Sequence, residues 1–223
     1  MKVTLVDSMG TDLSVARAAR VSFAKSTDYE TVVDKDNCLQ FVLSEKDQKL
    51  ITYLAKHKHV LPFRHPQITL HIKVPIFVLR QLSKHQVGMS MSEISRRYVD
   101  APPEFYYPVW RKRAKDKKQG STDEFPPDLD FVDGLYAQVT KSLAAAYRLM
   151  LEKEVSPEQA RALLPQSLYT EVHWTGSLLS FYHVYDLRSK PDAQKEVQEI
   201  ANQIDDIIKT LYPHSWEALK RYV

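Results

Sequence analysis

The chain has 223 residues and 43% hydrophobic residues, enough for a sizeable core, so its composition excludes a disordered or fibrous protein. A total of 31 Lys and Arg against 28 Asp and Glu leaves a formal net charge of +3, too small to indicate a polyanion as large as DNA as the partner. No segment has the apolar length that crosses a bilayer, and residues 1–7 lack the apolar core of a secretion signal, so we expect a cytoplasmic protein.

Strands and helices alternate over the first quarter of the chain. Apolar spacing predicts a strand at 1–6 and a short helix at 13–21. The polar stretch 25–37 has no periodicity, which indicates a loop. Ser44 and Asp47 then have the spacing of a capping box, which predicts the start of a second helix.

The centre of the chain contains the clearest strand. Apolar and polar residues alternate strictly over 68–74, which predicts a strand with one buried face. Pro75 suits the first turn of a helix, and helical spacing follows it. Residues 87–92 lack strong periodicity and predict a loop, and 101–127, rich in Pro, Tyr and charge, predicts a basic excursion over the surface.

The C-terminal half is mainly helical. The expected elements are a long helix with an apolar face from Leu135 to Met150, a short helix from Ser156, a strand at 168–174, a turn at Thr175 and Gly176, and helices at 178–185 and 197–211. This order predicts an α/β fold in which long helices pack on a modest mixed or antiparallel sheet. We expect a single domain over 1–223.

Cations, amides and hydroxyls are concentrated in the segment 80–98, directly after the predicted buried strand. Arginine can grip a phosphate with its planar fork, and Ser95 can complete the hydrogen bonds that a desolvated phosphate requires. Glu93 would repel phosphate, so we expect it to accept from a sugar hydroxyl or a ring N–H, or to orient an arginine. The alternative is a solvated helix end with internal ion pairs.

This segment resembles the signature of the flavin-dependent thymidylate synthases. The run Glu93-Ile-Ser95-Arg96-Arg97-Tyr98 is similar to the family's Glu-x-Ser-x-Arg-Tyr ending, and Lys84-His85-Gln86 stands in place of the family's Arg-His-Arg triplet. Similar blocks extend the resemblance over nearly the whole chain: 18–22, 58–63, 73–78, 160–170 and 186–194.

The resemblance implies that dUMP is converted to dTMP, with methylenetetrahydrofolate as carbon donor and NADPH as reductant through FAD. The residues it implies for the nucleotide are Gln81, Lys84, Glu93, Ser95, Arg96, Arg97, Arg161 and Arg188. Arg188 is the implied catalytic residue, because a guanidinium facing the uracil ring stabilises negative charge when N3 loses its proton. Such a reaction needs no enzyme nucleophile, so the single cysteine, Cys38, has no expected role.

The family's flavin contacts are implied in the same way. The residues expected around FAD are Ser22, His59, Lys84, His85, Gln86, Glu93, Ser177 and His183. The resemblance further implies a homotetramer in which neighbouring subunits share these sites.

Other interpretations remain open at this stage. A same-fold enzyme with the altered triplet could release a hydroxymethylated product or merely oxidise NADPH, and a degenerate copy would bind no flavin. The basic run 111–118 beside Tyr107 and Trp110 could bind single-stranded nucleic acid, but we favour a solvated loop because the run is short. The histidines at 57, 59, 65 and 71 lack the spacing of a metal site, so we expect no metal.

Overall fold

The computed structural model describes residues 1–33, 35–115 and 120–223. The strands are β1 (Lys2–Met9), β2 (Glu30–Val33), β3 (Leu39–Val42), β4 (Gln67–Pro75), β5 (Met89–Glu93) and β6 (Tyr169–Ser177). The helices are α1 (Asp12–Arg20), α2 (Glu45–Lys56), α3 (Ile76–Leu82), α4 (Leu129–Glu152), α5 (Pro157–Ala160), α6 (Leu178–Arg188), α7 (Lys195–Leu211) and α8 (Pro213–Tyr222). Short 3-10 turns occupy Val21–Phe23, Leu61–Arg64 and Arg161–Leu163.

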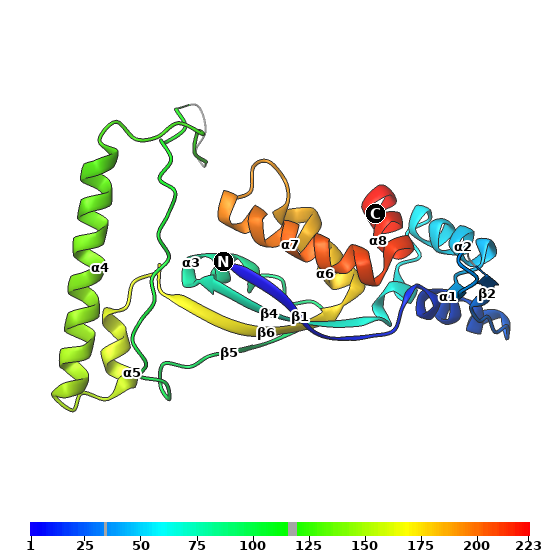
Figure 1. Ribbon diagram of the computed structural model, residues 1–223, viewed down its shortest axis with the longest axis horizontal. Helices are drawn as coiled ribbons and strands as arrows, with labels where there is room; N and C mark the ends of the chain where they lie inside the picture. Colours follow the sequence, from blue (N-terminus) through cyan, green and yellow to red (C-terminus); the bar gives the residue numbers. More distant parts are fainter. Residues whose placement is uncertain (34, 116–119) are drawn as a thin grey trace.

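An antiparallel sheet in the order β1-β4-β6-β5 runs along the middle of an elongated molecule, with α4 at one end and α1 and α2 at the other (Figure 1). Helices α6 and α7 cover one face of this sheet (Figure 1). The predicted α/β fold is therefore confirmed, with a sheet that is antiparallel.

The alternation predicted for the central strand is confirmed in β4. Its apolar side chains Ile68, Leu70, Ile72 and Val74 are all fully buried against the helices. The residues between them, such as His71 and Lys73, are only half-buried on the opposite face. Apolar and polar residues alternate in this part of the sequence because one face of β4 lies in the core and the other does not.

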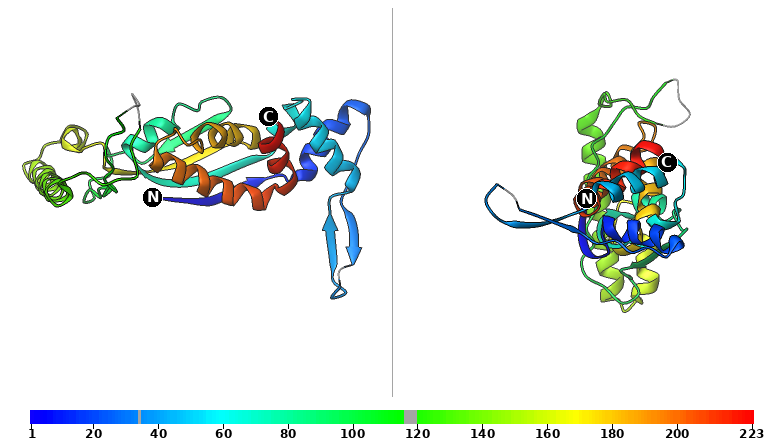
Figure 2. Two further views of the ribbon diagram at one scale, coloured as in Figure 1. Left: turned by 90° about the horizontal axis from the view of Figure 1, so that it is seen from above. Right: turned by 90° about the vertical axis from the view of Figure 1, so that its right-hand side faces the viewer.

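Two predicted loops contain strands. Part of the segment 25–37 forms β2, which pairs with β3 in a two-stranded hairpin that projects away from the rest of the molecule (Figure 2). The side chains of β2 are all exposed, so no apolar alternation marks them. The segment 87–92 overlaps β5, whose Met89 and Met91 pack against the core while Ser90 and Ser92 are exposed. Helix α8 was not predicted either.

Gly176 continues β6 and does not form the predicted turn with Thr175. A Cβ at Gly176 would lie 2.0 Å from Sδ of Met89 on the neighbouring strand β5. The close approach of the edge strand β5 therefore requires glycine at this position. The glycine that suggested a turn in the sequence is explained by this packing.

The predicted capping residue of α2 is confirmed. Ser44 accepts a hydrogen bond from the backbone N–H of Asp47 at 3.1 Å. The carboxylate of Asp47 is fully buried and pairs with Arg20 at 2.5 Å and with the hydroxyl of Thr27 at 2.5 Å. Burial raises the pKa of Asp47, but hydrogen bonds from Thr27, Arg20 and Ser44 outweigh it and lower the pKa below its ordinary value. This contact ties α1 and α2 together.

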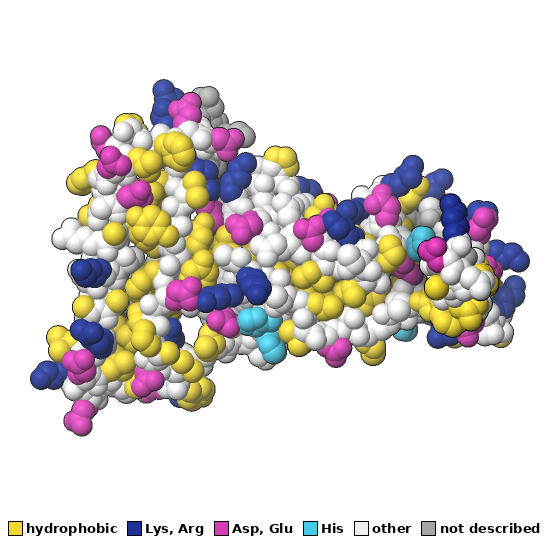
Figure 3. Space-filling view, in the orientation of Figure 1, with side chains coloured by type: hydrophobic (Ala, Val, Ile, Leu, Met, Phe, Trp, Pro, Cys, Tyr) yellow, Lys and Arg dark blue, Asp and Glu magenta, His cyan; other side chains and the backbone are white. Residues whose placement is uncertain are grey.

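The long helix α4 leaves several large apolar side chains exposed. Tyr147 is buried, whereas the exposed fractions of Phe131, Leu135 and Val139 are 70%, 50% and 47%. Hydrophobic side chains are gathered over this end of the molecule in the space-filling view (Figure 3). Within the described residues, no helix is both long and apolar enough to cross a membrane.

Candidate functional site

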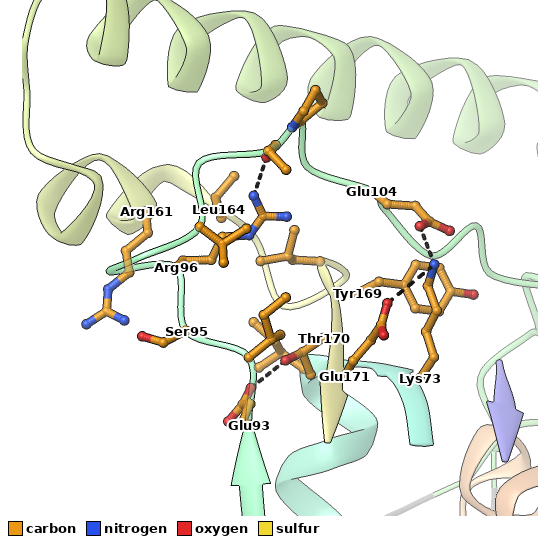
Figure 4. Close-up of a pocket in the computed structure, with 16 residues that line it drawn as sticks. Lys73, Glu93, Ser95, Arg96, Glu104, Arg161, Leu164, Tyr169, Thr170 and Glu171 are labelled. Atoms are coloured by element: carbon orange, nitrogen blue, oxygen red, sulfur yellow. Dashed lines mark hydrogen bonds and ion pairs between the residues drawn. The ribbon is translucent and has the colours of Figure 1, made fainter. Parts of the chain in front are cut away.

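A first cavity, the Ser95 cavity, lies where β5 leaves the sheet beside the start of β6. Its volume is about 480 Å³, and its lining includes Glu93, Ser95, Arg96 and Arg161 (Figure 4). Arg161 comes from the 3-10 turn after α5 and is brought next to the segment that follows β5 (Figure 4). Two guanidinium groups and a hydroxyl form a donor set that suits a phosphate.

Backbone hydrogen bonds fix the chain that carries these donors. The N–H of Ile94 donates to the carbonyl of Glu171 at 2.9 Å, so the chain stays tied to β6 as it leaves the sheet. The N–H groups of Tyr98 and Val99 then donate to the carbonyl of Ser95 at 3.0 and 3.1 Å. This turn holds Ser95 and the two following arginines in a defined loop.

Three of the four arginines of the predicted nucleotide site, Arg96, Arg97 and Arg161, donate to nearby protein oxygens. Nε of Arg161 donates to the backbone carbonyl of Glu158 at 3.2 Å, and Nε of Arg97 donates to the carboxylate of the same residue at 3.2 Å. Arg96 donates to the carbonyl of Ala101. Glu158 therefore orients two of the predicted phosphate-binding side chains.

Two acidic side chains of the Ser95 cavity, Glu104 and Glu171, are paired with basic groups. Lys73 pairs with Glu104 at 2.5 Å and with Glu171 at 3.9 Å, and His71 contacts Glu171 at 2.9 Å. The hydrogen bond to Glu104 is the main cause that raises the pKa of Lys73. The cavity thus has a neutralised side at β4 and β6 and a cationic side at Arg96 and Arg161.

Arg188 lies in a second cavity, the Arg188 cavity, of about 780 Å³, which Gln81 also lines. Nε of Arg188 donates to Nε2 of His85 at 3.0 Å, and its Nη2 donates to the backbone carbonyl of Gln81 at 2.8 Å. Burial, then the charges of Arg188 and His183, lower the pKa of His85 to about 4. His85 is therefore neutral at pH 7 and can accept from the guanidinium.

The excursion 101–127 supplies part of the wall of the Arg188 cavity. Arg111 and Ser121 line the cavity, and Nε of Arg111 donates to the hydroxyl of Ser121 at 2.8 Å. Nη2 of Arg111 pairs with the buried carboxylate of Glu196, in the first turn of α7, at 2.8 Å. Sequence reasoning placed Arg111 in a solvated basic run and missed this anchor, because its partner lies 85 residues away.

The aromatic residues proposed for nucleic-acid stacking are held against α4. Nε1 of Trp110 donates to Asp133 at 2.6 Å, and the hydroxyl of Tyr107 donates to the carbonyl of the same residue at 3.3 Å. Both rings pack edge-on against Tyr136. Residues 116–118 of the basic run lie outside the described residues. The contacts of Trp110 and Tyr107 favour a folded segment over a free stacking platform.

Ser22 and His59 line a third cavity, the Ser22 cavity, of about 1010 Å³. Ser22 lies in the 3-10 turn after α1, and His59 follows α2. Tyr53 and His57 also line this cavity, with ring centroids 4.3 Å apart. The Ser22 cavity therefore combines flat rings with a hydroxyl and lies at the α1 and α2 end of the molecule.

The other predicted flavin residues lie after α3, at the ends of β5 and β6, and on α6. Lys84 and Gln86 are exposed on either side of His85, directly after α3. Ser177 caps α6, where it accepts from the N–H of Ser180 at 3.2 Å, and His183 is exposed on the same helix.

One copy of the chain holds the predicted residues in separate groups. Glu93, Ser95, Arg96 and Arg161 share the Ser95 cavity, whereas Gln81 and Arg188 share another. Among the described residues, these two cavities have no lining side chain in common. Arg188 is therefore apart from the predicted phosphate donors within a single copy.

The histidines considered for a metal do not form one cluster. His57 and His59 lie at the Ser22 cavity, whereas His71 lies on the sheet and packs edge-on against His173. In the described part of the chain, no group of three or more His, Cys, Asp or Glu side chains has an arrangement that could hold a metal ion.

Comparisons with known proteins cover nearly the whole chain. Residues 4–214 match the family model described as "Thymidylate synthase complementing protein". A flavin-dependent thymidylate synthase from Thermus thermophilus is 38% identical over 222 residues, which span 99% of this chain and 76% of that protein. One from Kosmotoga olearia is 37% identical over 224 residues, which span 99% of this chain and 90% of that protein.

Solved structures give a similar result. The structure of a UMP/dUMP methylase, PolB from Streptomyces cacaoi, bound with 5-Br dUMP matches with a TM-score of 0.79 and 28% identity, covering 99% of this chain and 95% of that one. Its structure bound with 5-Br UMP matches with a TM-score of 0.80 and 29% identity, covering 99% and 94%.

Proposed function

Because the chain belongs to the thymidylate synthase complementing protein family, we propose that it is a flavin-dependent thymidylate synthase that converts dUMP to dTMP. Methylenetetrahydrofolate donates the carbon in this reaction, and NADPH supplies electrons through FAD. The observation that carries the proposal is the Ser95 cavity, which is lined by Ser95 and Arg96 from the segment after β5 and by Arg161 from the turn after α5, residues that can donate to a phosphate.

Arg188 has the surroundings that the proposed catalytic role requires. Burial lowers its pKa from the ordinary value, and its contacts with His85 and the Gln81 carbonyl fix the plane of the guanidinium. A fixed guanidinium against the uracil ring stabilises negative charge as N3 loses its proton, which raises electron density at C5. C5 can then attack the methylene carbon of the folate without a covalent enzyme adduct.

The flavin assignments are part of the same proposal. The Ser22 cavity offers flat histidine and tyrosine rings and a hydroxyl, a lining that fits a planar heterocycle with polar edges. Ser22, His59, Lys84, His85, Gln86, Glu93, Ser177 and His183 would hold FAD, with Lys84-His85-Gln86 as this chain's form of the family triplet. When bound, FAD supplies the redox chemistry that links NADPH to the transferred carbon.

We propose that the active unit is a homotetramer of single-domain protomers in the cytoplasm. Arg188 and the Ser95 cavity would complete one nucleotide site only when contributed by different copies, because they are apart within one chain. The uncovered apolar residues of α4, including Leu135 and Val139, give such an assembly a surface to bury.

A visible absorption spectrum of the purified protein is the first test. We expect a flavin spectrum that bleaches with NADPH when dUMP is present, and release of dTMP once methylenetetrahydrofolate is added. The product's mass separates dTMP from a hydroxymethylated nucleotide, and NADPH consumption without nucleotide product indicates an oxidase. UMP is assayed in parallel, because the PolB structures contain both nucleotide types. A colourless protein without turnover would contradict the proposal.

A further inference from the structure

Glu93 places a carboxylate in a cavity whose hydrogen-bond donors suit an anion. It lines the Ser95 cavity together with Arg96 and Arg161 (Figure 4). A carboxylate that paired with either guanidinium would occupy the donors that a phosphate needs. Something must therefore keep Glu93 from pairing with these arginines when the nucleotide is absent.

Thr170 is the residue that contacts this carboxylate. Its Oγ1 donates to Oε1 of Glu93 at 2.6 Å, and Thr170 is only 3% exposed (Figure 4). The contact joins the end of β5 to β6, where Glu93 pairs with Val172 in the strand register. A buried, β-branched side chain has little rotational freedom, so the hydroxyl is held in place for this hydrogen bond.

The two arginines donate to backbone carbonyls and not to the carboxylate of Glu93. Arg96 donates to Ala101, and Arg161 donates to Glu158 at 3.2 Å. Figure 4 shows the carboxylate of Glu93 turned toward Thr170, with Ser95 between Glu93 and Arg161. The neutral carbonyl contacts of the arginines leave their charge uncompensated within the Ser95 cavity.

We propose that Thr170 is a positioning residue that restrains Glu93, so that Arg96 and Arg161 stay available for the phosphate of the nucleotide. The inference rests on the proposed function, because it takes the phosphate of dUMP as the anion. Without the hydroxyl, Glu93 is released to pair with a guanidinium, and dUMP must first displace that pair.

The test compares three variants with the wild-type enzyme. Thr170→Val removes the hydroxyl with little change in shape, and we expect dUMP to bind about tenfold more weakly, with a smaller change in kcat. Thr175→Val is the matched control, because Thr175 lies on the same strand and its hydroxyl bonds Thr69 at 3.0 Å on the other face. Thr170→Ser keeps the hydroxyl and should restore binding.

A double variant separates positioning from a general loss of packing. In the Glu93→Gln background the competing charge is absent, so we expect Thr170→Val to weaken dUMP binding less there than it does in the wild-type background. Titration calorimetry with dUMP measures this without turnover. Binding in Thr170→Val within twofold of wild type, or an equal loss of affinity from Thr170→Val in the Glu93→Gln background, would overturn the inference.

A crystal structure of ligand-free Thr170→Val tests the same point without any nucleotide. We expect the Glu93 carboxylate within ion-pair distance of Arg96 or Arg161, and an unchanged carboxylate would overturn the inference. A wild-type protein that fails to bind dUMP would instead count against the proposed function. In that case the position of the Glu93 carboxylate in ligand-free Thr170→Val would still test whether Thr170 restrains Glu93.

Discussion

Arg188 donates from Nε to Nε2 of His85 across 3.0 Å, which joins two predicted site residues that are 103 positions apart in the chain. The bond requires a neutral imidazole, because a protonated ring has no acceptor nitrogen. His85 therefore helps to hold the proposed catalytic guanidinium in place, and it is also the middle residue of the altered family triplet.

The ionisation of His85 gives a pH prediction. Burial, then the charges of Arg188 and His183, lower its pKa to about 4 from the ordinary 6.5. Between those values the unfolded chain binds more protons than the folded protein, so this group's contribution to stability falls as pH drops from 6.5 to 4. NMR titration of the ring should show the low pKa, and in Arg188→Gln only a partial rise, since burial remains. A wild-type pKa near 6.5 would contradict the Arg188 contact.

Replacing Arg188 by lysine tests the guanidinium itself. Lysine keeps a positive charge but cannot reproduce the fixed planar fork that contacts both His85 and Gln81. We expect kcat to fall about 100-fold, with flavin still bound. Stopped-flow kinetics and the absorption spectrum measure the two effects. Arg221→Lys, on the exposed end of α8, is the control, and a near-normal rate in Arg188→Lys would remove the catalytic assignment.

Arg161→Ala should affect binding before chemistry. A phosphate contact acts equally in the ground and transition states, so its loss raises KM more than it lowers kcat. We expect the KM for dUMP to rise about 10- to 100-fold, the range for a lost charged hydrogen bond. Steady-state kinetics at two salt concentrations measures the change. Unaltered affinity for dUMP would show that Arg161 does not contact the phosphate.

Local patterns predicted the elements whose signal is contained in a few neighbouring residues. The alternation at 68–74 identified β4, and Ser44 identified the start of α2. The edge strand β5 was missed because its Met and Ser residues are weakly apolar and its partner β6 begins 80 residues later. The hairpin of β2 and β3 was missed because both its faces are exposed.

Some features of the candidate site were predicted from the sequence, and others were not. The resemblance grouped Ser95 with Arg161, and both line one cavity. The sequence did not reveal that Arg188 lies in another cavity, because a motif names residues without stating how they are arranged in space. The Thr170 contact with Glu93 was also missed, since the pair depends on the register of two strands.

The apolar face of α4 gives the last prediction. Leu135 and Val139 are four residues apart on the same side of the helix and are about half exposed. If copies bury this side against one another, Leu135→Glu with Val139→Glu should dissociate the assembly and, because the proposed sites are shared, abolish turnover. Light scattering gives the mass, and Lys141→Glu, two positions on and facing elsewhere, is the charge-matched control. A double variant with wild-type mass and activity would exclude this face from the assembly.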